Sequence, residues 1–507
     1  MSFSPRNESA FNDTKMRSGK VTPCSGMCSF CTAECAGTCE VGLAAILGKA
    51  AVYPTNTGNN QIAGEKDNPI DYSIFNINGR CFGARGAEED GDRATIFNVK
   101  LDRVIEGKNP VRLNVPLVLP AIIKLNWRDY FSAAAMAGTV CVIGEGSPSK
   151  DPDVEYRNGK IVRFEMLKEM LGAFNRYDRG YGQIVLQCNV EDDAQGLAEY
   201  AITQCGARAV EIKFGQSAKG TQPAVRLPSL EKAIAQKRNG LLVHPDPEDP
   251  AVAEAAKRGA CPVFWAYNRL PMWTEESLTR RVRELRELGA RNVYFKMAGY
   301  DRRDIERVLR IASSAEADMV TFDGAGGGSG YSPNRMMNEW GLPAVCIENA
   351  VVGVCRQLES EGRYIPFVTI TGGFSGEDQV FKALAIGAPY VKAVGLCRAA
   401  MAAAMVGDRV GISLEEGSVP KHLQKFGGTR EELFLELGEL RSLYGKVADQ
   451  IPTGAVGAYS YLKKIAFGLQ HFAALNRKFD IGLLGPEDLI PLTEEARRLL
   501  RGTWFEP

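Results

Sequence analysis

Five cysteines near the start of the chain have the residue type and spacing of a metal-cluster ligand set. They form a C-x3-C-x2-C-x3-C-x3-C array made of Cys24, Cys28, Cys31, Cys35 and Cys39. Spacings of two and three residues let successive sulfurs reach different irons of one cube, so the array favours a 4Fe-4S cluster. Four thiolates hold such a cluster, which leaves one of the five cysteines over.

Other interpretations of the cysteine array stay open. Zinc bound by four thiolates usually needs two cysteine pairs separated by a longer loop, which the array lacks. The first three cysteines also resemble the signature of radical S-adenosylmethionine enzymes, although no strand pattern precedes them and two further thiols follow at once. Unliganded thiols are the remaining alternative.

A glycine-rich loop in the second half of the chain indicates a site of another kind. The apolar run 317–323 has no helical period and leads directly into the loop 324–330, which is mostly glycine. This pattern predicts a buried strand followed by a loop whose main chain is open to a flat ring or a phosphate, because glycine has no Cβ. A flexible surface linker is the alternative.

Two similar strand-loop units follow, and together they predict a parallel α/β barrel. The runs 367–371 and 390–396 contain or lead into glycines, with a helical pattern over 377–386 between them. This order is typical of a (β/α)8 TIM barrel, whose last two strand ends commonly hold a phosphate. The earlier strand candidates, which bring the total to eight, are 113–121, 139–144, 183–189, 209–215 and 292–296.

Helical patterns separate several of these strands, as a TIM barrel requires. The clearest cover 275–288 and 344–361. The run 263–265 is a ninth apolar segment, which we interpret as an excursion from the barrel rather than as one of its strands.

The sequence predicts four parts around this barrel. They are an iron-sulfur segment (1–50), a lead-in or docking region (51–110), the (β/α)8 barrel (111–415) and a helical tail (416–507). The tail has amphipathic patterns over 431–443 and 459–475, so we expect it to pack on the barrel or on another subunit.

Composition narrows the class of partner. The 507 residues include 61 Lys and Arg against 61 Asp and Glu, which gives no electrostatic reason to expect nucleic acid or an acidic membrane surface. No apolar run approaches the length of a membrane span, and residues 1–17 are polar, so we expect a cytoplasmic protein that binds a small molecule. The eight cysteines outside the array, Cys141, Cys188 and Cys346 among them, are predicted to be small buried apolar residues.

Over residues 110–410 the chain resembles the FMN-binding synthase domain of glutamate synthase, and more closely the stand-alone glutamate-synthase-like FMN oxidoreductases of prokaryotes. Four stretches carry the resemblance: Glu211-Ile212-Lys213-Phe214-Gly215-Gln216-Ser217-Ala218-Lys219-Gly220, Val293-Tyr294-Phe295-Lys296, 323–333, and Thr371-Gly372-Gly373 with Lys392-Ala393-Val394-Gly395.

The resemblance implies a role for each of these stretches. Gly372, Gly373 and Gly395 would hold the FMN phosphate, and Gly324, Gly327 and Gly328 would lie near the isoalloxazine ring. Lys213, Gln216 and Lys296 would point from strand ends toward the ring. Ammonium groups there would stabilise the anionic reduced flavin. A charge solvated at a helix start is the alternative for Lys296. Only three histidines exist, so we expect Glu211, Lys296 or Asp323 to supply acid–base chemistry, with Lys213 as a further catalytic residue.

The chain also departs from the family pattern. Glutamate synthases hold a 3Fe-4S cluster through three cysteines after the last barrel strand, where this chain has only Cys397. A loop that contains glutamate in the family reads Gly220-Thr221-Gln222-Pro223, and a His-Asp pair is replaced by Ala325-Gly326. Because only one cysteine stands after the last barrel strand, we expect no 3Fe-4S cluster there. No cysteine nucleophile follows Met1, so we expect no built-in glutaminase of that family's type. No dinucleotide-binding motif follows a strand, so electrons should come from a separate partner.

These expectations combine into one functional hypothesis. The N-terminal cluster passes electrons singly to FMN, and the flavin reduces the imine of a 2-oxo acid, as in the conversion of 2-oxoglutarate and ammonia to glutamate. The electron donor would be a ferredoxin or a pyridine-nucleotide oxidoreductase subunit, and the protein would be oligomeric. Lys213, Lys219 and Arg226 are candidates to bind substrate carboxylates. The alternatives are a reductase or methylamine–glutamate-type synthase subunit, and an electron-transfer subunit without substrate chemistry.

Overall fold

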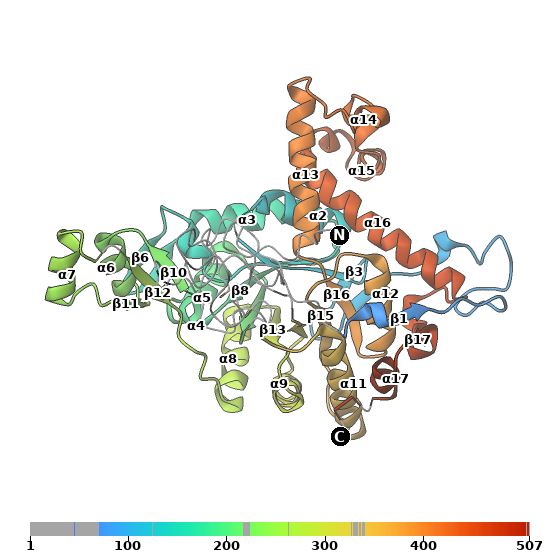
Figure 1. Cartoon of the computed structure of the whole chain (residues 1–507), viewed down its shortest axis with the longest axis horizontal. Helices are drawn as coiled ribbons and strands as arrows, with labels where there is room; N and C mark the ends of the chain where they lie inside the picture. The colour runs from blue at the N-terminus through green and yellow to red at the C-terminus, as the bar shows by residue number, and fades with distance from the viewer. Residues whose placement is uncertain are drawn as a thin grey trace, which may run out of the picture.

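The computed structural model of the chain describes residues 45, 70–123, 125–215, 224–261, 263–325, 327, 333, 336, 340–502 and 504–505. The five-cysteine array lies outside these residues. Figure 1 shows a central barrel surrounded by helices, with a small sheet at one side and a helical tail that runs along the other.

Eight parallel strands close into a barrel, which confirms the predicted (β/α)8 fold. In chain order they are β4 (Leu117–Ile122), β5 (Val140–Ile143), β8 (Gln183–Cys188), β9 (Ala209–Lys213), β13 (Asn292–Ala298), β14 (Met319–Asp323), β15 (Phe367–Thr371) and β16 (Val391–Gly395). Each strand pairs with the next, and β16 returns to β4 through Val394 and Leu117. All eight predicted strands contribute to this barrel.

The first predicted strand, 113–121, is divided in the structure. Leu113 ends the antiparallel hairpin of β2 (Arg103–Ile105) and β3 (Val111–Leu113), and the barrel strand begins only at Leu117. Pro116 separates the two, because a proline has no N–H for a sheet ladder.

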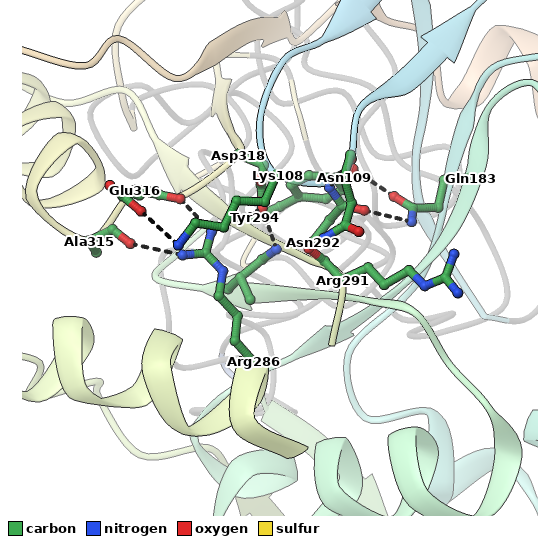
Figure 2. A network of polar contacts seen from close by, with 11 residues as sticks. Lys108, Asn109, Gln183, Arg286, Arg291, Asn292, Tyr294, Ala315, Glu316 and Asp318 are labelled. Atoms are coloured by element: carbon green, nitrogen blue, oxygen red, sulfur yellow. Dashed lines mark hydrogen bonds and ion pairs between the residues drawn. The ribbon is translucent and has the colours of Figure 1, made fainter. Parts of the chain in front are cut away.

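The hairpin closes the amino end of the barrel. Ile105, Val111 and Leu113 pack against inward-facing barrel residues such as Tyr294 and Phe367. Polar contacts also join the turn of the hairpin to the barrel (Figure 2): Asn292 donates to the carbonyl oxygen of Asn109, and Gln183 donates to the side-chain oxygen of Asn292. Chemistry that needs an open barrel end must therefore lie at the carboxyl end.

Helices cover the outside of the barrel. They are α2 (Trp127–Ala137), α3 (Glu165–Asn175), α4 (Val190–Ala194), α5 (Leu197–Cys205), α8 (Glu275–Leu288), α9 (Arg302–Ser314), α11 (Ala344–Ser360), α12 (Glu377–Ile386) and α13 (Arg398–Glu415). The predictions of α8, α11 and α12 are confirmed. Thr274 caps the start of α8 through the N–H of Ser277, and Gly289 ends it with a φ of +117°.

The excursion between β9 and α8 forms a separate small sheet. Its strands β10 (Ala224–Leu227), β11 (Leu242–His244) and β12 (Phe264–Tyr267) are antiparallel, and α6 (Leu230–Arg238) and α7 (Pro250–Lys257) connect them. They have their own apolar cluster, which includes Leu227 and Phe264. The prediction that 263–265 lies outside the barrel is confirmed.

The C-terminal tail packs on the barrel through one long helix. It consists of α14 (Arg430–Leu433), α15 (Leu437–Tyr444), α16 (Thr453–Leu475), β17 (Leu489–Pro491) and α17 (Glu494–Arg501). The helix α16 lies against α2 and α13 (Figure 1). The predicted helix 431–443 is interrupted, because Phe434 leaves the helical conformation and is buried. β17 pairs with β1 (Phe75–Ile77), near the start of the described chain.

Shorter elements complete the described chain. They are the hairpin of β6 (Glu155–Arg157) and β7 (Lys160–Arg163) and the 3-10 helices η3 (Tyr72–Ile74), η4 (Ile96–Asn98), η5 (Ser147–Lys150), η7 (Gln424–Phe426), η8 (Gly445–Gln450), η9 (Ile481–Leu483) and η10 (Pro486–Asp488). Of the eight cysteines predicted to be buried, Cys141, Cys188, Cys346 and Cys355 are buried. The prediction is wrong for the other four, because Cys81 is exposed and Cys205, Cys261 and Cys397 are only partly buried. Among the described helices, none combines the length and apolar composition needed to cross a bilayer.

Candidate active site

A cavity of about 430 Å³ lies at the carboxyl end of the barrel. Its lining comes from the ends of seven strands and from the loops after β14, β15 and β16. The predicted residues that line it are Lys213, Lys296, Asp323, Gly327, Gly372, Gly373 and Gly395. Residues far apart in the sequence therefore meet at one site.

Strand register explains why these side chains meet. Lys213 and Lys296 are direct partners in the β9–β13 pair, and Asp323 and Thr371 are partners in the β14–β15 pair. Side chains alternate along a strand, so residues that face the barrel interior near each carboxyl end point toward the same space. The inner wall thus changes from apolar at the amino end to charged at the carboxyl end.

Lys213 forms an ion pair at the edge of this space. Its Nζ lies 2.5 Å from Oε1 of Glu145, and the two side chains are only 5% and 13% exposed. Glu145 lies two residues after the end of β5 and was not among the predicted site residues. Its position one residue beyond a predicted strand was the available signal, because TIM-barrel sites are built from strand ends.

Glu211 lies below the cavity rather than in its lining. It is 1% exposed, and its Oε1 accepts a hydrogen bond of 2.5 Å from Nε2 of Gln187. Burial raises the pKa of the Glu211 carboxyl; the Lys296 ammonium, the Gln187 amide and Lys213 lower it, and Asp323 raises it further. Gln187 does line the cavity, and sequence reasoning missed it.

Lys296 is buried at the cavity wall and is not a solvated charge at a helix start. It is 5% exposed, and no carboxylate oxygen of the described residues lies within 4.0 Å of its Nζ. A buried ammonium group next to a cavity favours a ligand with negative charge, because such a charge is costly to bury without a partner.

The glycine loop after β15 has a backbone that other residues adopt only with strain. Gly372 and Gly373 have φ angles of +121° and +83°. A Cβ on Gly372 would lie 2.7 Å from the carbonyl oxygen of Gly324, while the space beside Gly373 is open. The loop therefore brings its main chain to the cavity at Gly373 while Gly372 packs against the loop after β14.

Of the other predicted glycines, some line the cavity and one packs against a neighbouring helix. A Cβ on Gly395 would lie 2.7 Å from the Cβ of Thr371, so the last strand also needs a glycine where it reaches the cavity. Gly327 folds over Asp323, where a Cβ would lie 2.5 Å from its Oδ1. Gly324 is not in the cavity lining, and a Cβ there would meet the backbone of Ala344 at 2.8 Å.

The start of α13 faces the same cavity. Arg398, its first residue, lines the wall, and within the described chain no side chain caps this helix. A guanidinium group and open helix N–H groups together suit a phosphate. Sequence reasoning did not include Arg398, although it follows the last strand by three residues.

Cys397 contributes a protonated thiol to the lining. Burial raises its pKa, which a hydrogen bond with Tyr130 and the charge of Lys296 partly oppose. Within the described residues, no group of three or more Cys, His, Asp or Glu side chains is placed to hold a metal ion.

Several predicted residues lie elsewhere. Gln216, Lys219, Gly328 and the cysteines Cys24, Cys28, Cys31, Cys35 and Cys39 lie outside the described residues. Arg226 is exposed on β10, in register with Trp265, and does not line the cavity. Arg226 is therefore not a candidate for binding a substrate carboxylate in this cavity.

A second cavity of about 440 Å³ lies between α16 and the amino end of the barrel. It is lined by Val115, Met136 and Tyr459 and by none of the predicted site residues. The conserved geometry of TIM-barrel enzymes places chemistry at the carboxyl end, so we take the first cavity as the candidate active site.

The fold and the charged cavity define a TIM barrel with a ligand site at the carboxyl end. The sequence pattern described as "Conserved region in glutamate synthase" matches residues 268–407, which include Lys296, Asp323 and Gly372. A glutamate synthase large subunit-like protein of Rhizobium meliloti (strain 1021) is 29% identical over 328 residues, which are 59% of this chain and 64% of that protein. An archaeal glutamate synthase (NADPH) of Methanocaldococcus jannaschii is 32% identical over 191 residues, which are 36% and 32%.

The chain is thus similar to glutamate-synthase-like proteins, in agreement with the sequence resemblance. It spans less than two thirds of the length of these relatives. Among solved structures, a flavocytochrome b2 variant with sulfite bound aligns over 86% of this chain and 78% of its own, with 12% identity and a TM-score of 0.45. A soluble mutant of (S)-mandelate dehydrogenase from Pseudomonas putida aligns over 83% and 88%, with 15% identity and a TM-score of 0.43.

Proposed function

We propose that the chain is an FMN oxidoreductase of the glutamate synthase type, which reduces the imine of a 2-oxo acid. The observation that carries the proposal is the buried ammonium group of Lys296, which shares a cavity with Lys213, Arg398 and the Gly372-Gly373 loop. An ammonium group in this position favours a ligand that gains negative charge during the reaction, as a flavin does on reduction.

The cavity residues fit the parts of FMN. The volume of the cavity, about 430 Å³, falls within the range of small-molecule sites, roughly 300–1,000 Å³. Arg398, the uncapped start of α13 and the main chain at Gly373 suit a phosphate. Lys296 suits the side of the ring that becomes anionic.

The residues of this chain would bind, orient and hold protons around the cofactor. FMN, when bound, accepts electrons one at a time and delivers two to the substrate as a hydride. Arg398 would bind the phosphate, and the Nζ of Lys296 would stabilise negative charge on the ligand. Lys296 and Asp323 are the predicted acid–base residues that line the cavity and could hold a proton next to the substrate, whereas Glu211 is separated from the cavity.

The similarity to glutamate synthases supports a proposal for the substrate and the electron source. Reduction of 2-oxoglutarate and ammonia to glutamate consumes two electrons and releases water, and it requires cations for two carboxylates. We propose that a ferredoxin or a pyridine-nucleotide oxidoreductase subunit supplies the electrons through a 4Fe-4S cluster at the N-terminal cysteines. Matched relatives named glutamate synthase (NADPH) support a nicotinamide as the ultimate donor.

The first experiment is an absorbance spectrum with iron and acid-labile sulfide assays on protein purified without oxygen. We expect flavin bands and about four irons per chain. The double variant Cys28→Ala/Cys31→Ala should lose the iron and keep the flavin, whereas Cys81→Ala, which changes an exposed cysteine outside the array, should keep both.

The outcomes separate the parts of the proposal. Protein that binds no FMN would contradict the oxidoreductase assignment, and protein with zinc in place of iron would contradict the route of electron entry. Reduced protein that is reoxidised by 2-oxoglutarate with ammonia, and by neither alone, would support the imine reduction. Full reduction without reoxidation by this pair would contradict it.

A further inference from the structure

We propose that Gln187 is a positioning residue that holds the Glu211 carboxylate beneath the cavity, and so sets the negative charge that acts on the ammonium groups of Lys213 and Lys296. Its effect on a bound flavin rests on the proposed function. Its effect on the protein without flavin does not, and the two can be measured separately.

Strand register brings Gln187 to Glu211. The two residues are direct partners in the β8–β9 pair, and the amide Nε2 donates to Oε1 of Glu211 over 2.5 Å. The amide oxygen of Gln187 accepts a hydrogen bond of 3.4 Å from the backbone N–H of Glu145. Both ends of the amide are thereby fixed, since the reverse orientation would bring two oxygens together at Glu211.

Glu211 needs this donor because it is almost inaccessible to water. Its exposed fraction is 1%, and that of Gln187 is also 1%. Burial alone raises the pKa of Glu211, and the Gln187 hydrogen bond is one of three influences that lower it. The other charged or titratable groups around Glu211 are Lys213, Lys296, Asp323, Tyr294 and, beyond Gln187, Glu145.

The Glu211 carboxyl in turn interacts electrostatically with two like charges, the ammonium groups of Lys296 and Lys213. Lys213 and Lys296 are direct partners on neighbouring strands, which lie about 4.8 Å apart. They are 6% and 5% exposed. Negative charge at Glu211 offsets the repulsion between the two ammonium groups, in addition to the Glu145 carboxylate that pairs with Lys213. The hydrogen bond from Gln187 favours the charged form of Glu211 and therefore limits the net positive charge at the cavity.

The test compares Gln187→Leu with Gln183→Leu. Gln183 is the matched control because its side chain also forms amide hydrogen bonds, with Asn292 and Tyr294, but at the amino end of the same strand β8. In the FMN-bound protein, the flavin midpoint potential is measured at neutral pH. Loss of the Gln187 donor favours the neutral form of Glu211 and so removes negative charge next to the cavity. We therefore expect Gln187→Leu to strengthen binding of reduced relative to oxidised FMN at least tenfold, an upward shift of about 30 mV for two electrons. Gln183→Leu should leave the potential unchanged.

The second measurement is urea unfolding of the protein without FMN between pH 5 and pH 8. Loss of the Gln187 donor should raise the pKa of Glu211 further, so the native variant would bind an additional proton over a range where the wild type has released it. The stability deficit of Gln187→Leu should therefore grow as pH rises, because stability falls with pH wherever the native state holds more protons. Gln183→Leu should lose stability by an amount that does not change with pH.

Each result has a distinct meaning. Wild-type protein that binds no FMN would contradict the proposed function, and the unfolding series would still decide the role of Gln187. A deficit for Gln187→Leu that is independent of pH, or an unchanged potential in a variant that binds FMN normally, would overturn the positioning role. A third variant, Gln187→Glu, places a carboxyl next to Glu211, and its potential should approach the wild-type value as acid neutralises the introduced group.

Discussion

The Nζ of Lys213 lies 2.5 Å from Oε1 of Glu145, so an ion pair joins the ends of β9 and β5 across the strand β8 that separates them. Both side chains are mostly removed from water. A buried pair of this kind fixes geometry more than it adds stability, because desolvation offsets much of the attraction.

Removing one partner of this pair should therefore cost more than removing both. We expect Lys213→Met to lower the free energy of unfolding by about 3 kcal/mol, since Glu145 would keep a buried charge without its lysine. The double variant Lys213→Met/Glu145→Gln should recover most of that loss. Urea unfolding of the two single variants and the double variant measures the coupling, and strictly additive losses would show that the pair is not coupled.

Lys296→Met should change the redox potential of bound FMN more than the stability of the fold. We expect the reduced flavin to bind at least tenfold more weakly relative to the oxidised flavin, because a buried ammonium group of the cavity wall is lost. Lys392→Met is the control, since Lys392 lies on β16 near the ring of Phe367 and outside the cavity lining. Spectroelectrochemical titration tests this, and equal potentials for the two variants would contradict the assignment of Lys296.

The two glycines after β15 should respond differently to alanine. Gly372→Ala combines a φ of +121° with a Cβ only 2.7 Å from the carbonyl oxygen of Gly324, so we expect a loss of stability of about 3 kcal/mol. Gly373→Ala has the strained φ of +83° but open space, so the loss should be about 1 kcal/mol. Its main consequence should be weaker FMN binding. Urea unfolding and FMN titration of both variants separate these effects, and equal stability losses would contradict the packing argument.

Asp192, which lies outside the cavity, should make the stability of the folded protein depend on pH. Burial raises its pKa to about 7, even though the backbone N–H groups of Gly146 and Asn189 donate to it. Because the folded value lies above the unfolded one, this group should reduce stability as pH rises from about 4 to about 7.

Replacing the carboxyl by an amide tests that dependence. Relative to the wild type, Asp192→Asn should gain up to about 1.4 kcal/mol for each pH unit in that window. The exposed Asp153→Asn should show no such gain. Unfolding curves at pH 4.5 and pH 7.5 are sufficient, and parallel losses for Asp192→Asn and the wild type would remove Asp192 as the cause.

The barrel could be predicted because its signals are local. The run 367–371 is β-branched and ends in glycine, and α8 begins at a capping threonine and ends at a glycine. Register, by contrast, depends on long-range pairing. The sequence indicated Lys213 and Lys296 as separate candidates, but only the β9–β13 pair makes them direct neighbours.

The missed residues show the same limit. Gln187 and Glu145 carry no motif, and their importance comes from the partners that neighbouring strands bring to them. Gly324 belongs to a conspicuous glycine run, yet its lack of a side chain serves contact with α11 rather than with the cavity. Composition can indicate that a loop is open, but it does not determine which of its residues faces the ligand.

The closure of β16 on β4 also sets the order in which the site can come into existence. The sulfur of Cys397 lies beside the carbonyl oxygen of Pro120, although 277 positions separate them in the chain. During synthesis, the strands that carry Gln187, Lys213 and Lys296 emerge from the ribosome long before Gly395 and Arg398. The complete cavity is thus a late product of translation, and a chain that stops before β16 would hold the lysines without the wall that completes their site.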